Sequence, residues 1–246
     1  MPGGGGLRGS ILRTEGRPGL NDFPVKVMDA SGAGPKRWTR NALVMSLAVA
    51  AVLGMAVCRG PILRTMGATL VAQDPLSPAD VIVVAIDAGA AGILETADLV
   101  HAGIAKRVAV FAQAPDAVDT EFVRRGFKYE DKAVMWRRML ATLGVTNVEQ
   151  IPVPANSTEA EGLLLPGWCE EHHLHSIIVV TTPDHSRRVR RVLGRAMKGR
   201  ATRVIVRPAR VSSFDPKNWW RSRGGLRTGI VELEKLLLDI VRHPFS

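Results

Sequence analysis

The chain has 246 residues, of which 46% are hydrophobic, and this content is ordinary for a globular protein and excludes general disorder. Its 33 basic residues outnumber 23 acidic ones, and the resulting formal charge of +10 favours anionic partners such as phosphates or acidic lipid head groups. Only two cysteines occur, which excludes a disulfide framework, and no zinc-finger spacing or RNA-recognition motif is present, so no nucleic-acid partner is expected.

The N-terminal region is dominated by glycine, proline, arginine and serine, and it includes the glycine run Gly3–Gly6. Such a composition buries too little apolar surface to fold, so residues 1–40 are expected to form a disordered segment. Translation from Met28 is an alternative that would leave a short charged leader before the next segment.

Residues 41–58 carry no charged side chain over a length that can cross a thin bilayer as a helix. The alternative is a cleaved signal peptide, for which Ala56-Val57-Cys58 is a poor cleavage site. Basic residues are denser before the stretch than after it, namely Lys36, Arg37 and Arg40 against Arg59 and Arg64. We therefore expect a single-pass anchor in the cell membrane, with the C-terminal domain on the extracytoplasmic side.

After a connector over residues 59–78, the domain at residues 79–246 alternates between apolar β-branched runs and helical periodicity. Residues 113–128 are expected to form a long loop. Strands separated by helices predict a Rossmann-like three-layer α/β domain with a mostly parallel sheet, preceded by one transmembrane helix. The expected strands are 79–86, 107–112, 148–153, 177–181 and 203–207, and the expected helices are 93–103, 129–143, 157–172, 183–197 and 228–241.

The clearest strand–turn–helix unit covers residues 177–197. Thr182 is expected to be the N-cap of its helix and Pro183 the first helical residue. His185 and Arg188 then lie in the first turns, at the sheet edge where open α/β sheets bind ligands and helix N-termini favour anions. The alternative is a solvated basic helix face with one polar histidine, formed by Arg187, Arg190, Arg191 and Arg195.

The loop after the first expected strand, Asp87–Gly92, resembles a dinucleotide-binding fingerprint whose first glycine is replaced by aspartate. The next strand ends in Gln113 instead of the acidic residue that holds a ribose. A conventional nicotinamide site is therefore rejected, and the sequence identifies no cofactor. The small residues around Gly89 still allow the backbone to approach a ligand closely.

Several short motifs occur in a fixed order along the domain. They are Asp74-Pro75-Leu76 with Ala79-Asp80-Val81-Ile82-Val83-Val84, Leu94-Glu95-Thr96-Ala97 with Gly103, Asp131-Lys132-Ala133-Val134-Met135 with Leu143-Gly144-Val145, Asn156-Ser157-Thr158-Glu159, and Thr182-Pro183-Asp184-His185-Ser186-Arg187-Arg188. Their order and spacing from about Leu63 to the C-terminus resemble the YdcF/SanA/ElyC-like family of envelope proteins. The resemblance implies a Rossmann-like domain linked to cell-envelope biogenesis.

The chain departs from the pattern of this family at one end of the implied site. Ala85-Ile86-Asp87-Ala88-Gly89 stands where the family usually has a Gly-Gly loop. Ile93 replaces an arginine, and Ala112-Gln113 replaces a Ser-Gly pair. These departures indicate a divergent member.

Carboxylates and one histidine follow the turns after the expected strands, and such groups can supply general acid–base catalysis or hold a divalent ion that bridges phosphates. We expect Glu159, His185 and Asp131 to be catalytic, and no resident metal site is assigned. Each of these residues also has a structural alternative. Glu159 can be the carboxylate of a capping box, and Asp131 can be a favourable charge at a helix N-terminus. His185 can be a polar residue whose hydrogen bonds are satisfied within the first helical turn. The expected ligand-binding residues are Asp87, Gly89, Glu95, Thr182, Asp184 and Arg188.

Among the arginines of the helix expected at 183–197, Arg188 is expected to bind a phosphate, while Arg191 and Arg195 are expected to be only solvated.

Two classes of function remain open. The first is a membrane-anchored envelope protein that acts on or binds an anionic phosphorylated partner, either a small molecule or a lipid carrier, such as a lipid-linked or nucleotide-linked sugar. The alternative is a non-enzymatic binding or regulatory module with a degenerate site, which the altered loop at Asp87–Gly92 motivates.

The charge pattern around residues 41–58 yields a prediction of topology. Protease added to sealed spheroplasts is expected to digest the C-terminal domain, because that domain lies outside the cytoplasmic membrane. Complete protection of the domain until the membrane is opened would contradict the assignment.

Overall fold

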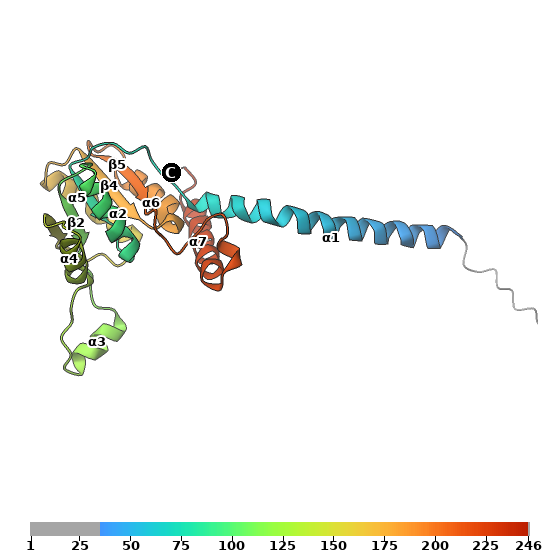
Figure 1. The fold of residues 1–246 in the computed structure, drawn as a ribbon, viewed down its shortest axis with the longest axis horizontal. Helices are drawn as coiled ribbons and strands as arrows, with labels where there is room; N and C mark the ends of the chain where they lie inside the picture. The colour runs from blue at the N-terminus through green and yellow to red at the C-terminus, as the bar shows by residue number, and fades with distance from the viewer. Residues whose placement is uncertain (1–34, 246) are drawn as a thin grey trace, which may run out of the picture. The chain divides into compact units, whose positions relative to one another are not determined.

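The computed structural model describes residues 35–245 (Figure 1). Residues 1–34, which contain most of the segment expected to be disordered, lie outside the described part. The chain divides into two units, Met1–Leu53 and Gly54–Ser246. The α/β domain belongs to the second unit.

The first helix, α1, extends from Pro35 to Leu70. Its part Trp38–Leu70 is long and apolar enough to cross a membrane, which agrees with a membrane anchor. The first part of the expected connector over residues 59–78 is helical, because α1 continues to Leu70 with Pro61 inside it. Gly67 and Leu70, in the last turns of α1, pack against Trp219 of the domain.

Five parallel strands form one sheet in the order β3-β2-β1-β4-β5, which confirms the expected fold class. Side chains of the central strands are fully buried, as continuous Val and Ile runs predict for a sheet covered on both faces. The strands are β1 (Val81–Val84), β2 (Val108–Phe111), β3 (Val148–Ile151), β4 (Ser176–Thr181) and β5 (Arg203–Pro208).

The helices of the domain complete a three-layer arrangement. Contacts pair α2 with α4 and α5 with α6, and right-handed crossovers put these two pairs on opposite faces of the sheet. The terminal helix α7 packs against α6. The bounds are α2 (Gly89–His101), α3 (Ala117–Arg124), α4 (Lys132–Thr142), α5 (Thr158–Glu171), α6 (Pro183–Ala196), the short 3-10 helix η1 (Trp219–Arg221) and α7 (Arg223–Arg242).

Two helices differ from expectation. The segment 113–128 was expected to be a loop, but it contains α3, whose N-terminus is closed by a capping box between Asp116 and Asp119. Helix α7 begins at Arg223, earlier than residue 228, because the hydroxyl of Ser222 accepts a hydrogen bond from the amide of Gly225. Local caps therefore extended the helical content beyond what hydrophobic periodicity indicated.

A second, smaller core joins the last turns of α1 to α7. It contains the buried side chains of Leu70, Phe214, Trp219 and Leu236. The indole Nε1 of Trp219 donates a hydrogen bond of 2.7 Å to the carbonyl of Leu63, so the ring is held by both a polar and an apolar contact. Trp219 consequently fixes η1 between α1 and α7.

This packing predicts the effect of one added methyl group. A Cβ atom at Gly229 of α7 would collide with the ring of Trp219, so Gly229→Ala is expected to destabilise the fold by about 1–3 kcal/mol. The matched control is Gly224→Ala in the first turn of α7, where a Cβ meets nothing within 4 Å. Thermal midpoints measure both effects, and equal midpoints would contradict the contact between Trp219 and α7.

Candidate functional site

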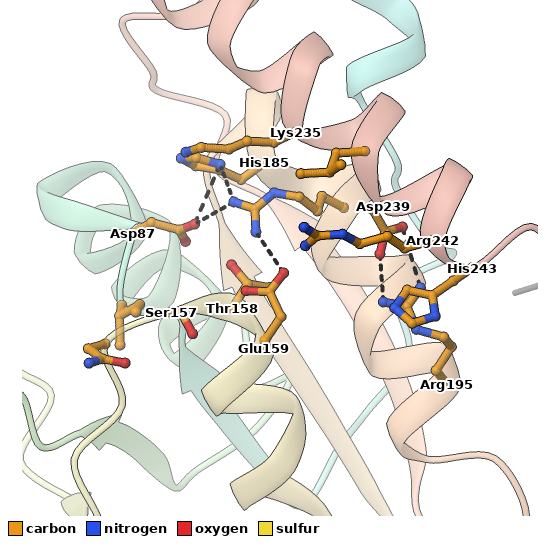
Figure 2. Close-up of a pocket in the computed structure, with 14 residues that line it drawn as sticks. Asp87, Ser157, Thr158, Glu159, His185, Arg195, Lys235, Asp239, Arg242 and His243 are labelled. Carbon is orange, nitrogen blue, oxygen red and sulfur yellow. Dashed lines mark hydrogen bonds and ion pairs between the residues drawn. The ribbon is translucent and has the colours of Figure 1, made fainter.

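A cavity of about 490 Å³ opens at the carboxyl ends of β1 and β4. In the order β3-β2-β1-β4-β5, the connections run in opposite directions from this pair of strands, and such a switch point is where open α/β sheets bind ligands. Figure 2 shows side chains from the β1–α2 turn, the N-terminus of α5, α6 and α7 around it. The lining residues are Ile86, Asp87, Asn156, Ser157, Thr158, Glu159, His185, Arg188, Arg195, Lys235, Leu238, Asp239, Arg242 and His243.

His185 lies in the first turn of α6 and forms the inner wall of the cavity. Its Nδ1 lies 2.7 Å from Oε2 of Glu232 and 3.5 Å from Oδ2 of Asp87, and its Nε2 lies 3.5 Å from Oδ2 of Asp184. Burial alone would lower the pKa of His185, but the hydrogen bond to Glu232 and the surrounding carboxylates outweigh burial and raise it. The site therefore favours the imidazolium form.

Arg188 lies one turn further along α6, and its side chain is only 9% exposed. Its Nε donates a hydrogen bond of 3.3 Å to Oε2 of Glu232. One terminal nitrogen lies 3.9 Å from the carboxylate of Asp87, and the other lies 3.9 Å from that of Glu159. The terminal nitrogens of the guanidinium group thus lie at the cavity between two carboxylates, and one of them is also 3.2 Å from Nδ1 of His185.

Glu232 of α7 connects these cations beneath the cavity. Its side chain is buried, its Oε2 accepts from His185 and Arg188, and its Oε1 accepts from Lys235 Nζ at 2.7 Å. Burial raises the pKa of Glu232, but the hydrogen bond and charge of His185 with those of Lys235 and Arg188 lower it overall, to about 2. One ionised carboxylate therefore holds three cations.

Glu232 was not among the residues expected from the sequence, although a signal for it exists. It lies on the same face of α7 as Gly225, Gly229 and Leu236, and all four are buried. An acidic residue within the inward face of an amphipathic helix requires a cation, and the sequence offers Lys235 three residues away and the basic helix α6 as sources of one.

Glu159 lies at the lip of the cavity, with a side chain that is 63% exposed. Its interpretation as a capping-box carboxylate is wrong. Ser157 is the N-cap of α5 and accepts a hydrogen bond from the amide of Ala160, which occupies the position that a capping-box glutamate would take. Glu159 faces Arg188 instead.

Glu161 is a second buried carboxyl group that the sequence analysis did not identify. Its Oε1 accepts a hydrogen bond of 2.8 Å from the amide of Ile86, in the loop after β1. Burial and the negative charge of Asp87 raise the pKa of Glu161 to about 8, so the group is mostly protonated at neutral pH. It supports the loop that carries Asp87, whose carboxylate in turn accepts from Thr181 at the end of β4.

Of the expected site residues, Asp87, Glu159, His185 and Arg188 line the cavity. Asp184 is buried behind His185, and burial raises its pKa despite the charge of His185. Thr182 is the N-cap residue of α6, as expected, but its side chain makes no capping hydrogen bond.

The structure places three further expected residues outside the cavity lining. Asp131 is the N-cap of α4, and its carboxylate accepts from the amides of Gln113 and Ala133 and from the side chain of Gln150. Glu95 is buried beneath Arg207 and Arg210, which ties α2 to the end of β5. Gly89 opens α2 with a positive φ of 54°, so glycine there serves the backbone conformation. The carboxylates of Asp131 and Glu95 therefore have structural partners.

The interpretation of the basic side of α6 as a solvated face is wrong. Arg191 and Arg195 both form ion pairs with the buried Asp239 of α7, and Arg195 also lines the cavity. Arg187 donates to the carbonyls of Thr69, in the last turn of α1, and of Val71, just after it. The arginines on this side of α6 therefore bind α7 and the chain around the end of α1.

The arrangement can bind an anion and move a proton. Within residues 35–245, no group of three or more His, Cys, Asp or Glu side chains is placed to hold a metal ion. The chain matches no protein-family model and no curated protein sequence.

Glu161 yields a prediction for pH dependence. A carboxyl group whose pKa is higher in the folded than in the unfolded state contributes stability at low pH, and this contribution is lost as the pH rises toward 8. Glu161→Gln keeps the acceptor for Ile86 without ionising. The variant is therefore expected to gain on the order of 1–3 kcal/mol over the wild type between pH 6 and pH 8.5.

Chemical denaturation of the wild type, Glu161→Gln and the exposed control Glu171→Gln at several pH values measures this difference. A constant offset between the wild type and Glu161→Gln across the pH range would show that Glu161 is already ionised in the folded protein.

Proposed function

We propose that the protein is a membrane-anchored member of the YdcF/SanA/ElyC-like family that acts on or binds a phosphorylated envelope precursor. The substrate class is a lipid-linked or nucleotide-linked sugar. The observation that carries the proposal is the convergence of Asp87, Glu159, His185 and Arg188 in one cavity at the β1/β4 edge. These residues belong to three different strand–helix connections, and only the folded sheet edge brings them together.

Charge supports an anionic ligand. Besides His185 and Arg188, the cavity is lined by Arg195, Lys235 and Arg242. A phosphate entering between these cations would accept several charge-assisted hydrogen bonds, and guanidinium groups can bind it with two parallel bonds. The carboxylates of Asp87 and Glu159 would then lie beside the phosphate, where they suit sugar hydroxyl groups or a proton in transfer.

The extracytoplasmic location is part of the same proposal. Helix α1 contains a segment able to cross the membrane, and the basic residues before residue 41 favour an outward-facing domain. A domain held at the outer surface of the cytoplasmic membrane has access to lipid-linked envelope precursors.

The second candidate is a binding or regulatory module without chemistry. It is favoured by the engagement of both His185 and Arg188 with Glu232, since the buried carboxylate needs these partners whether or not a ligand binds. The altered loop Ala85–Gly89 also favours it. The two candidates share the ligand and differ in whether Glu159 and His185 transfer protons.

Binding is tested with UDP-N-acetylglucosamine and with a polyprenyl phosphate in detergent micelles, using the full chain and titration calorimetry. Arg188→Ala is expected to weaken binding by about 1.5–3 kcal/mol, the scale of charge-assisted hydrogen bonds. The matched control is Arg203→Ala, at the exposed start of β5 and outside the cavity. Since Arg188 also pairs with Glu232, binding is measured well below the thermal midpoint of the variant. An equal loss in both variants would show a diffuse electrostatic surface.

Catalysis is tested by complementation of a deletion strain with Glu159→Gln and His185→Ala. Because Glu159 is exposed and caps nothing, Glu159→Gln is expected to keep the thermal midpoint and to lose function, as general acid–base groups contribute about 10²–10⁴-fold to rate. Glu171→Gln on the same helix serves as the control. Full function in both Glu159→Gln and His185→Ala would contradict the site assignment, whereas retained ligand binding with lost function would favour the enzyme.

A further inference from the structure

Helix α7 carries an apolar stripe that nothing in the described part of the chain covers fully. Its members recur at the spacing of one helix face, and four of them are between 40% and 69% exposed. We call this set the α7 stripe, and it consists of Leu226, Ile230, Leu233, Leu237 and Val241.

The α7 stripe is separate from the face that packs on the domain. The inward face is formed by Gly225, Gly229, Glu232, Leu236 and Asp239, all of which are buried. A helix on the surface of a soluble domain has one apolar face and an opposite polar one. Helix α7 therefore has a second apolar surface, of the kind that marks contact with a membrane or a partner.

The location of the α7 stripe indicates that its partner is lipid. Leu233, the middle member of the stripe, packs with Leu63 of α1 against the core around Trp219, so the stripe lies beside the last turns of α1. Figure 1 shows these turns next to α7. Ile62 and Met66 extend the exposed apolar surface on α1, within the segment that can cross a membrane. Through Leu233 and Leu63, the stripe thus adjoins the last turns of the helix that can cross a membrane.

The charges of the side chains that flank the stripe are positive, and anionic lipids attract positive charge. Arg223 and Arg227 flank it on α7, and Arg64 lies on the neighbouring part of α1, all with exposed side chains. Two of the three acidic residues of α7, Glu232 and Asp239, are buried in ion pairs and contribute nothing to this surface. An apolar face with basic flanks is the composition of a helix that lies in the membrane interface.

We propose that α7 lies in the plane of the membrane interface, with the α7 stripe among the acyl chains and Arg223 and Arg227 at anionic head groups. The domain then has two membrane contacts, the α1 anchor and α7. The cavity lies on another side of α7, where Lys235, Leu238 and Arg242 line it, so this contact holds the cavity close to the lipid surface.

The test places a fluorescent probe on the stripe in the full chain. The exposed Cys58 is replaced by serine, while the buried Cys169 stays, and NBD is attached through Leu237→Cys or Ile230→Cys. The matched control is Leu163→Cys on α5, a leucine that is 82% exposed. The proteins are reconstituted in vesicles of phosphatidylcholine and phosphatidylglycerol, with or without bromine on the acyl chains.

We expect brominated lipid to quench the probes at positions 237 and 230 at least twofold more than the probe at position 163. Equal, weak quenching at all three positions would overturn the proposal. Probes at 237 and 230 that are shielded from aqueous iodide but not quenched by brominated lipid would also overturn it. Such a result would assign the stripe to a second copy of the chain, and the shielding would then depend on the protein-to-lipid ratio. Circular dichroism of each labelled variant checks that α7 is intact.

Discussion

The buried carboxylate of Glu232 holds three cationic side chains at the junction of α6 and α7. All three of these side chains, His185, Arg188 and Lys235, line the cavity. Removing one partner from a buried ion pair costs about 3–5 kcal/mol, because the remaining charge stays buried without compensation. The same interaction therefore fixes the positions of side chains that line the cavity and fastens the terminal helix to the domain.

Helix α7 links the features of the molecule that bear on function. One side carries Glu232 and Asp239, which pair with the arginines of α6. A second side lines the cavity with Lys235 and Arg242, and a third carries the α7 stripe. Its glycines let Trp219 approach closely, and Trp219 in turn holds the last turns of α1. Helix α7 consequently lines the cavity and packs, through Trp219, against the last turns of α1.

The fold could be predicted from the sequence because the central strands β1 and β4 contain continuous β-branched runs and helical segments alternate with the strands. The presence of Asp87, Glu159, His185 and Arg188 at one edge follows from the same pattern, since the carboxyl ends of parallel strands meet there. Asp131 and Glu95 occupy similar places in the chain, yet local amides and two arginines take up their carboxylates. Whether a carboxylate faces a cavity or a backbone donor depends on three-dimensional neighbours that periodicity does not contain.

The contribution of α7 could not be predicted for a related reason. Hydrophobic spacing indicated a terminal helix but not its partner, and the pairing of Asp239 with Arg191 and Arg195 joins residues more than forty positions apart. The interpretation of α6 as a solvated face failed because it assigned the arginines without these partners. Charge balance within buried faces is the information that periodicity alone omits.

The most direct test of the role of Glu232 is the NMR titration of His185 in the full chain, assigned with His185→Gln. The account predicts that the pKa of His185 lies above its ordinary value in the wild type and falls in Glu232→Gln, where the glutamine keeps the shape but not the charge. An unchanged pKa of His185 in Glu232→Gln, or a value below the ordinary one in the wild type, would contradict the claim that this buried carboxylate organises the site.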